Sequence, residues 1–323
     1  MHSKLKYCLL ALQALFVLSL GALSDKSIPF ELTRPLVAGV IIWSVGVTFF
    51  VIRGFFHLPL EPRPLLRLVG QIKSEWRIFT RALEWALILG LALALHGWAK
   101  SMIPHVTSYW ADPMLADADH FIFGRDPWQM FRSDLLGAVY SRAYVLWFPI
   151  AFGLMGLLAF SRRDHSVLLN ASLASLILGG TIGQYILPSA GPIYFERVGL
   201  GARFAELVAT NDPTFNALAD YLWRFYAAGG AGLGTGISAM PSMHVTWAVW
   251  SVLAARAIWK PLAIPAVVYA GIIWAASIAS GWHYALDGAV GVGIALGSYA
   301  FCKRMEVARG AVVAAQPLPS PAA

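Results

Sequence analysis

The sequence predicts an all-α fold, a polytopic membrane bundle of about eight transmembrane helices, and three observations support this prediction. Of the 323 residues, 58% are hydrophobic and only 13% are charged, whereas a soluble domain carries about a quarter charged residues. Apolar segments close to the roughly 20 residues that cross a bilayer core recur along the chain. The net charge of +7 comes from basic residues in alternate loops. That pattern is typical of a membrane protein and does not indicate a nucleic-acid partner.

Eight apolar segments account for the predicted helices. They lie at about 7–23, 36–55, 82–103, 137–160, 167–187, 244–259, 262–282 and 285–302. The first follows Lys4 and Lys6, so it could be a cleaved signal peptide or a first transmembrane helix; we favour a retained helix. The two cysteines, Cys8 and Cys302, stand near opposite ends of the chain and indicate neither a disulfide framework nor a metal site.

The charges of the loops predict the orientation. Six Lys or Arg residues against two Glu occupy residues 53–81, whereas residues 104–136 hold five Asp against two Arg. Because basic loops stay in the cytoplasm, both termini are expected inside. Arg256, Lys260 and the basic residues at 303–309 agree with this orientation. The loops at 104–136 and 188–243 are then extracytoplasmic, in a bacterial protein periplasmic, and the bilayer is the plasma (inner) membrane.

Both long outer loops are expected to contain structure. Residues 104–136 include apolar and aromatic side chains that predict an interfacial helix lying on the headgroup layer. Residues 188–243 hold three prolines, a predicted short helix at about 214–227 and a glycine-rich run at 229–236. Ordered loops of this length are usually functional.

Two short stretches, at 236–244 and 281–287, carry the residues that could perform chemistry. His283 and Asp287 are four residues apart, so on a helix they share one face. A carboxylate in that position can accept the proton of one ring nitrogen, which fixes the tautomer and leaves the other nitrogen as a nucleophile or base. Taken alone, the pair could also be a polar pair at a helix end.

His244 follows Pro241 and Ser242 at the start of a predicted helix. That position makes Ser242 a helix N-cap beside the free N–H groups of the first turn, which form a ready anion site. His244 could protonate a departing oxygen there. The apolar residues 245–280 suffice for two crossings and a turn, which returns both histidines to the same membrane face.

These motifs resemble the type 2 phosphatidic acid phosphatase (PAP2) superfamily. The likeness rests on Pro-Ser-Met-His at 241–244 and His-x-x-x-Asp at 283–287, and it is closest to the branch of inositol phosphorylceramide synthase-like inositolphosphotransferases. Two further stretches match, Asp119 with 123–127 and Pro-Ser-Ala-Gly-Pro at 188–192.

The resemblance implies a division of the chain and a set of roles. Residues 82–302 would form a six-helix catalytic domain. The resemblance does not cover residues 1–81, where hydropathy and charge predict two further helices with a basic loop, or residues 303–323, whose small and Pro-rich composition predicts a disordered cytoplasmic tail. His283 would take the phosphoryl group as a phosphohistidine, Asp287 would orient it, and His244 would act as acid and then base. No cofactor or metal is expected.

One departure from the family concerns the groups that bind the phosphate. Ser277 stands where the family has an arginine, and the family's Lys-x6-Arg-Pro element is absent. A developing phosphoryl charge still needs cationic or N–H stabilisation. The candidates are Arg197 and Arg224, with Tyr194 as a hydroxyl donor and Gly236 closing a run that could cradle a phosphate; weaker ones are Arg125, Arg132, Arg142 and Arg203.

Three classes of function remain open from the sequence. The first is a membrane enzyme that acts on a lipid-linked phosphate, with water as acceptor in a phosphatase or an alcohol such as inositol in a head-group phosphotransferase. The second is a non-catalytic lipid-phosphate transporter or flippase, for which the polar and glycine-rich positions 179–184 are the only hint. The third, a haem or metal protein using His244 and His283, lacks further ligand spacing.

Overall fold

The computed structural model describes residues 4–24, 64–229 and 234–314, together with isolated positions between 33 and 48. All regular secondary structure in these ranges is helical, which confirms the predicted all-α fold. The longer helices are α1 Leu5–Leu23, α3 Pro64–Ser74, α4 Trp76–Val106, α5 Ala111–Phe123, α7 Asp134–Ala159, α8 Ser166–Ala174, α10 Pro213–Ala227, α11 Met243–Ile258, α12 Ala263–Ala279 and α13 Ala285–Ala314. The short ones are α6 Trp128–Phe131, α9 Ala205–Ala209, the π-helix η1 Ser175–Ile182 that continues α8, and the 3₁₀ turns η2 Gly183–Tyr185, η3 Pro192–Tyr194 and η4 Lys260–Leu262.

Six helices of the described part are long and apolar enough to cross a membrane. They are α1, α4, α7, α8 with its continuation to Tyr185, α12 with η4, and α13. The segment expected at 244–259 forms α11, which has 16 residues, fewer than the roughly 20 of a full crossing. The segment expected at 36–55 lies largely outside the described residues. The chain is therefore a polytopic membrane bundle, with six of the eight expected spans present at full length.

Helix α1 packs into the bundle through polar as well as apolar side chains. Gln13 is fully buried, and its Nε2 donates to the carbonyl oxygen of Ala92 and to Oγ1 of Thr181, both at 2.9 Å. The buried ammonium of Lys6 lies 2.7 Å from the carboxylate of Glu84. Because buried polar groups are costly unless they are paired, these contacts fix how α1 lies against α4 and η1.

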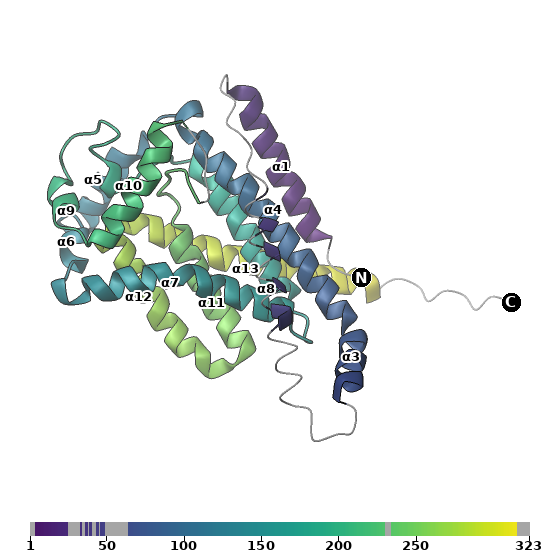
Figure 1. The fold of residues 1–323 in the computed structure, drawn as a ribbon. Helices are drawn as coiled ribbons and strands as arrows, with labels where there is room; N and C mark the ends of the chain where they lie inside the picture. Colours follow the sequence, from purple (N-terminus) through teal and green to yellow (C-terminus); the bar gives the residue numbers. More distant parts are fainter. Residues whose placement is uncertain are drawn as a thin grey trace.

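The non-spanning helices α5, α6, α9 and α10 gather at one end of the bundle, opposite the end at which α13 leaves it (Figure 1). The expected interfacial segment of the 104–136 loop is α5 with α6, and the expected short helix at 214–227 is α10. Helix α10 begins where its sequence dictates. Asp212 is the N-cap and accepts a hydrogen bond from the backbone N–H of Thr214 at 2.8 Å, and Pro213 occupies the first helical position.

The C-terminal helix differs from the expectation. Helix α13 continues to Ala314, so the first part of the segment expected to be a disordered tail at 303–323 is helical. Residues 315–323 lie outside the described part.

Candidate active site

Three segments of the chain meet at the end of the bundle that carries α5 and α10, at residues 188–193, 236–242 and 281–287. Backbone hydrogen bonds join them. The N–H of Ala239 donates to the carbonyl oxygen of Ser189 at 2.8 Å, and the N–H of Ile193 donates to that of Gly281 at 2.8 Å. Oγ of Ser189 also accepts from the N–H of Met240 at 3.0 Å. The segment at 188–193 thus joins the two histidine motifs by hydrogen bonds.

Gly191 allows this close packing. Its φ angle is +95°, and a Cβ added there would lie 2.7 Å from the carbonyl oxygen of Trp282. Only glycine adopts this conformation without strain and leaves room for the neighbouring backbone. The residue type at 191 is therefore set by the approach of the segment that carries His283.

Asp112 of α5 binds two of the three segments. Its carboxylate accepts from the N–H groups of Ala190 at 2.6 Å and Gly191 at 2.9 Å, and from the hydroxyl of Tyr284 at 2.8 Å. Burial raises the pKa of Asp112 to about 6, and the hydrogen bonds from Ala190, Tyr284 and Gly191 oppose that rise. No sequence motif indicated this role for Asp112.

Asp119 lies seven residues further along α5 and binds the start of α13. Its carboxylate accepts from the N–H groups of Ala285 at 2.6 Å and Leu286 at 3.1 Å, which have no partner within the helix. Burial raises its pKa to about 6 as well, against the same kind of backbone hydrogen bonds. Positions seven apart share a helix face, so this spacing was the one signal that pairs Asp119 with Asp112.

The ring of His283 is held by a backbone carbonyl. Its Nδ1 lies 2.7 Å from the carbonyl oxygen of Ala239 and 3.4 Å from Oδ2 of Asp287. Since a carbonyl oxygen can only accept, Nδ1 carries the proton and Nε2 keeps its lone pair. The structure thus assigns the tautomer that a nucleophilic Nε2 requires.

Asp287 is fully buried and also shapes the helix start. Its Oδ2 accepts from the N–H of Tyr284 at 2.9 Å, three residues earlier, as in a capping box. Its backbone carbonyl accepts from the N–H of Ser242 at 3.1 Å. The carboxylate therefore lies beside His283, and the same residue joins the two histidine motifs.

His244 faces His283 across the site. The centroids of the two rings are 5.7 Å apart. The ring of His244 stacks on Tyr144 at 4.2 Å and contacts Trp147 at 4.5 Å, and its backbone carbonyl accepts from Nε1 of Trp147 at 2.9 Å. Ser242 is the N-cap of α11, as its position suggested, because its Oγ accepts from the N–H of Val245 at 3.3 Å.

The sequence profile of the PAP2 superfamily matches residues 125–301, which is more than half of the chain. The chain belongs to the PAP2 superfamily. A curated relative, the phosphoinositol dihydroceramide synthase of Bacteroides thetaiotaomicron, is 28% identical over 176 residues, which cover 49% of this chain and 52% of the relative. The chain thus aligns with about half the length of that relative. No solved structure matches the chain.

The PAP2 match contains both histidines and Asp287 but begins after α5. The two aspartates that bind the histidine segments, Asp112 and Asp119, therefore stand outside the matched residues. Among the residues that the structure describes, no three His, Cys, Asp or Glu side chains come together as a metal site would need.

Three other predicted site residues, Tyr194, Arg197 and Arg224, either contact residues outside the three joined segments or are exposed. The hydroxyl of Tyr194 donates to the carbonyl oxygen of Ala219 at 3.2 Å. Arg197 pairs with Asp220 at 2.6 Å, and Arg224 is exposed on α10. Of the weaker candidates, Arg203 pairs with Asp117 and Asp126, Arg132 contacts Thr210, and Arg125 and Arg142 are exposed.

Ser277, which replaces the family's arginine, belongs to the framework behind His283. It is fully buried, and its Oγ donates to the carbonyl oxygen of Trp274 at 2.8 Å. Its own carbonyl accepts from the N–H of His283 at 3.1 Å. The position supports the nucleophile segment and supplies no positive charge.

Proposed function

We propose that this PAP2 protein is an integral membrane phosphatase or phosphotransferase that acts on a lipid-linked phosphate through a phosphohistidine at His283. The observation that carries the proposal is the facing pair of rings. His244 and His283 are 39 positions apart in sequence, yet their ring centroids lie 5.7 Å apart, and the Nδ1 of His283 is held by Ala239.

In the first step, Nε2 of His283 attacks the phosphorus atom, and the bond from phosphorus to the leaving alcohol oxygen breaks. His244 gives that oxygen its proton, so the alcohol leaves neutral. The positive charge that develops on His283 is stabilised by the Ala239 carbonyl at 2.7 Å and by Asp287 at 3.4 Å. The N-terminus of α11, capped by Ser242, favours negative charge on the phosphoryl oxygens.

In the second step, the acceptor attacks the phosphorus atom from solvent or from the membrane. His244, now neutral, takes the acceptor's proton, and the bond between phosphorus and Nε2 breaks, which restores the enzyme. Water as acceptor gives hydrolysis, and an alcohol gives head-group transfer. The name of the Bacteroides thetaiotaomicron relative, phosphoinositol dihydroceramide synthase, favours transfer with inositol phosphate chemistry over simple hydrolysis.

We further propose that the site opens on the extracytoplasmic side of a bacterial inner membrane, with both termini in the cytoplasm. The support is the sequence charge pattern, with basic loops at 53–81 and 303–309 and an acidic loop at 104–136.

The test is a trapping experiment with ³²P-labelled phosphatidylinositol and phosphatidic acid, with and without free inositol. Wild-type protein should form an acid-labile, base-stable phosphoryl adduct, and His283→Ala should form none. Free phosphate and transferred head group are scored separately, which separates hydrolysis from transfer. Normal product release without any adduct would replace the covalent step by direct attack of water. Passage of the intact labelled lipid across a proteoliposome without turnover would favour the transporter.

A further inference from the structure

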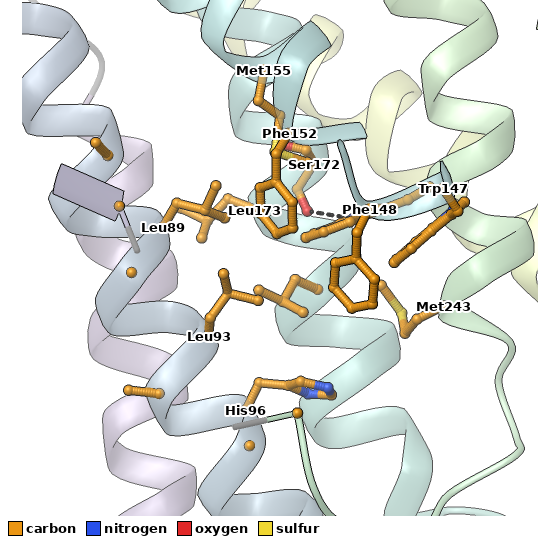
Figure 2. Close-up of a pocket in the computed structure, with 18 of the residues that line it drawn as sticks. Leu89, Leu93, His96, Trp147, Phe148, Phe152, Met155, Ser172, Leu173 and Met243 are labelled. Atoms are coloured by element: carbon orange, nitrogen blue, oxygen red, sulfur yellow. Dashed lines mark hydrogen bonds between the residues drawn. The ribbon is translucent and has the colours of Figure 1, made fainter. Parts of the chain in front are cut away.

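A cavity of about 700 Å³ lies beside His244, between α4, α7 and α8. In Figure 2 the α4 side chains face those of α7 and α8 across it. The labelled ones are Leu89, Leu93 and His96 of α4, Trp147, Phe148, Phe152 and Met155 of α7, and Ser172 and Leu173 of α8. Nearly all of these side chains are apolar. A cavity of this size is in the range that holds a small organic ligand.

The cavity is long and follows the helix axes. On α4 its lining runs from Ala82 to Lys100, and 18 residues of helix span roughly 27 Å at 1.5 Å each. That length approaches the hydrocarbon thickness of a bilayer, about 30 Å. On α7 the lining runs from Tyr144 to Ala159, and Phe160 follows directly after the helix. An apolar space of this length suits an extended hydrocarbon chain.

One end of the cavity is polar and rich in donors. Lys100, Tyr144, Trp282 and His244 all line the cavity, and the ring centroid of Tyr144 lies 4.2 Å from that of His244 and 6.2 Å from that of Trp282. The hydroxyl of Tyr144 and Nε1 of Trp282 are buried, and neither has a hydrogen-bond partner among the residues that the structure describes. An unpaired buried donor is unfavourable, because it has lost its hydrogen bonds to water and gained no partner. Two such groups in one cavity indicate an acceptor that the described part of the protein does not supply.

Lys100 adds the charge. It is the one Lys or Arg among the described residues that line the cavity, and within the described part no carboxylate lies at ion-pair distance from it. A lysine ammonium near two unpaired neutral donors is suited to an anion, and phosphate is a common partner of lysine in proteins.

Gly236 fixes the surroundings of this lysine. Its φ angle is +94°, and a Cβ added there would lie 2.8 Å from Cγ of Lys100. The segment that leads to Pro241 and His244 therefore packs directly on the stem of Lys100, which holds the ammonium at the cavity end that His244 lines. This contact gives the glycine at 236 a physical role in the site.

We propose that the cavity holds the hydrocarbon chain of a lipid phosphate, and that Lys100, Tyr144 and Trp282 donate to its phosphate oxygens. This proposal rests on the proposed function and supplies the charge that Ser277 does not. It places the phosphate next to His244, whose ring is 5.7 Å from that of His283. The apolar walls distinguish a lipid phosphate from free inorganic phosphate, which would leave them empty.

Binding without turnover tests the proposal. The full chain carrying His283→Ala, purified in nanodiscs, is titrated with hexadecyl phosphate, hexadecanol and inorganic phosphate. Lys100→Met removes the charge and keeps the stem, and Tyr144→Phe removes one donor and keeps the ring. Leu93→Trp fills the apolar part. The matched controls are Lys260→Met in the exposed turn before α12 and Leu87→Trp on the exposed face of α4.

We expect Lys100→Met to lower the affinity for hexadecyl phosphate by about 10- to 100-fold, as the loss of a charged hydrogen bond does. The affinity of this variant for hexadecanol should stay within a few-fold of that of the parent protein. Tyr144→Phe should lower the affinity for hexadecyl phosphate by about 5-fold and leave the affinity for hexadecanol unchanged. Leu93→Trp should weaken both alkyl probes at least about 10-fold, because an overfilled site loses its ligand space. Neither control variant should change the affinity for either alkyl probe.

Three results would overturn the proposal. One is hexadecyl phosphate binding that Lys100→Met and Tyr144→Phe both leave unchanged. Another is inorganic phosphate binding as tightly as hexadecyl phosphate. The third is a loss of binding in the double variant Arg197→Ala with Arg224→Ala that the Lys100 variant does not share.

If binding behaves as expected while wild-type protein forms no phosphoryl adduct, the proposed function fails and the lipid-phosphate site stands. If the adduct forms but the cavity variants bind hexadecyl phosphate normally, the proposed function stands and the lipid-phosphate site fails.

Discussion

The Nδ1 of His283 lies 2.7 Å from the carbonyl oxygen of Ala239, which is closer than the 3.4 Å that separates it from the carboxylate of Asp287. A main-chain carbonyl therefore shares the task that the motif alone gives to the aspartate. The carbonyl cannot be removed by side-chain substitution, and it is itself fixed because the N–H of Ala239 is bound by Ser189 at 2.8 Å. The ring orientation is consequently a property of the backbone at 236–242, just before His244.

Asp287→Asn should for this reason cost less than the about 10⁴-fold that removal of the aspartate costs in a hydrolase triad. We expect a loss of roughly 10- to 1,000-fold in kcat, because the tautomer survives and only the charge beside the imidazolium is lost. The thermal midpoint should change little, since the amide oxygen can still cap the Tyr284 N–H. Asp287→Ala, which also removes the cap, is the comparison. A loss of 10⁴-fold or more in Asp287→Asn would return the orienting role to the carboxylate.

His244→Ala should lower the rate of phosphoryl transfer to His283 by a factor that depends on the leaving group of the substrate. Alkyl alcohols need a proton as they depart, whereas p-nitrophenolate does not, so the alkyl ester should lose at least about 100-fold more rate than the p-nitrophenyl ester. The measurement is single-turnover formation of the phosphoryl adduct with both esters. Equal losses for the two would assign His244 to binding instead of proton transfer. Trp247→Phe, a change one turn further along α11, is a control for packing.

The two aspartates of α5 predict a dependence of stability on pH. Burial raises the pKa of Asp112 to about 6, above the ordinary value of about 3.9, so the folded state binds a proton that the unfolded state releases between these values. The contribution of this group to the free energy of unfolding is thus full below about pH 4 and is lost as pH rises through about 6, by up to roughly 3 kcal/mol. Tyr284 and Asp287 face the same carboxyl group.

Thermal midpoints of wild type and Asp112→Asn between pH 4 and pH 7 provide the check. The advantage of the wild type should shrink as pH rises, and Asp119→Asn should behave alike because its pKa is also raised to about 6. Glu206→Gln, at an exposed carboxylate of α9, should run parallel to the wild type. An advantage that grows with pH would mean that the hydrogen bonds from Ala190 and Gly191 outweigh burial.

The predicted orientation can be tested by cysteine labelling in intact cells. Thr214→Cys is exposed at the start of α10, and Lys260→Cys is exposed in the turn before α12; Cys8 and Cys302 are first replaced by alanine. An impermeant maleimide should label the first position in intact cells and the second only after lysis. The opposite pattern would place the site in the cytoplasm and overturn the charge argument.

The sequence by itself determined those features whose cause is local. Apolar runs near 20 residues predicted helices at α1, α4, α7, α8, α12 and α13, because hydropathy and length are properties of one segment. The four-residue spacing of His283 and Asp287 and the cap at Ser242 follow from helix geometry alone. The length between the motifs was enough to bring His244 to the same face as His283.

The tertiary structure decided which remote groups complete the site. The acceptor for His283 is a carbonyl 44 residues away, and Asp112 reaches Gly191 and Tyr284 across 79 and 172 residues. In the sequence, Lys100 is a lysine near the end of an apolar helix. Only the packing of α4 against α7 and against the segment at 236 places it in a cavity with His244. Such contacts leave no periodic trace, because a hydrogen bond or a cavity wall depends on the distance between folded segments and not on spacing along one of them.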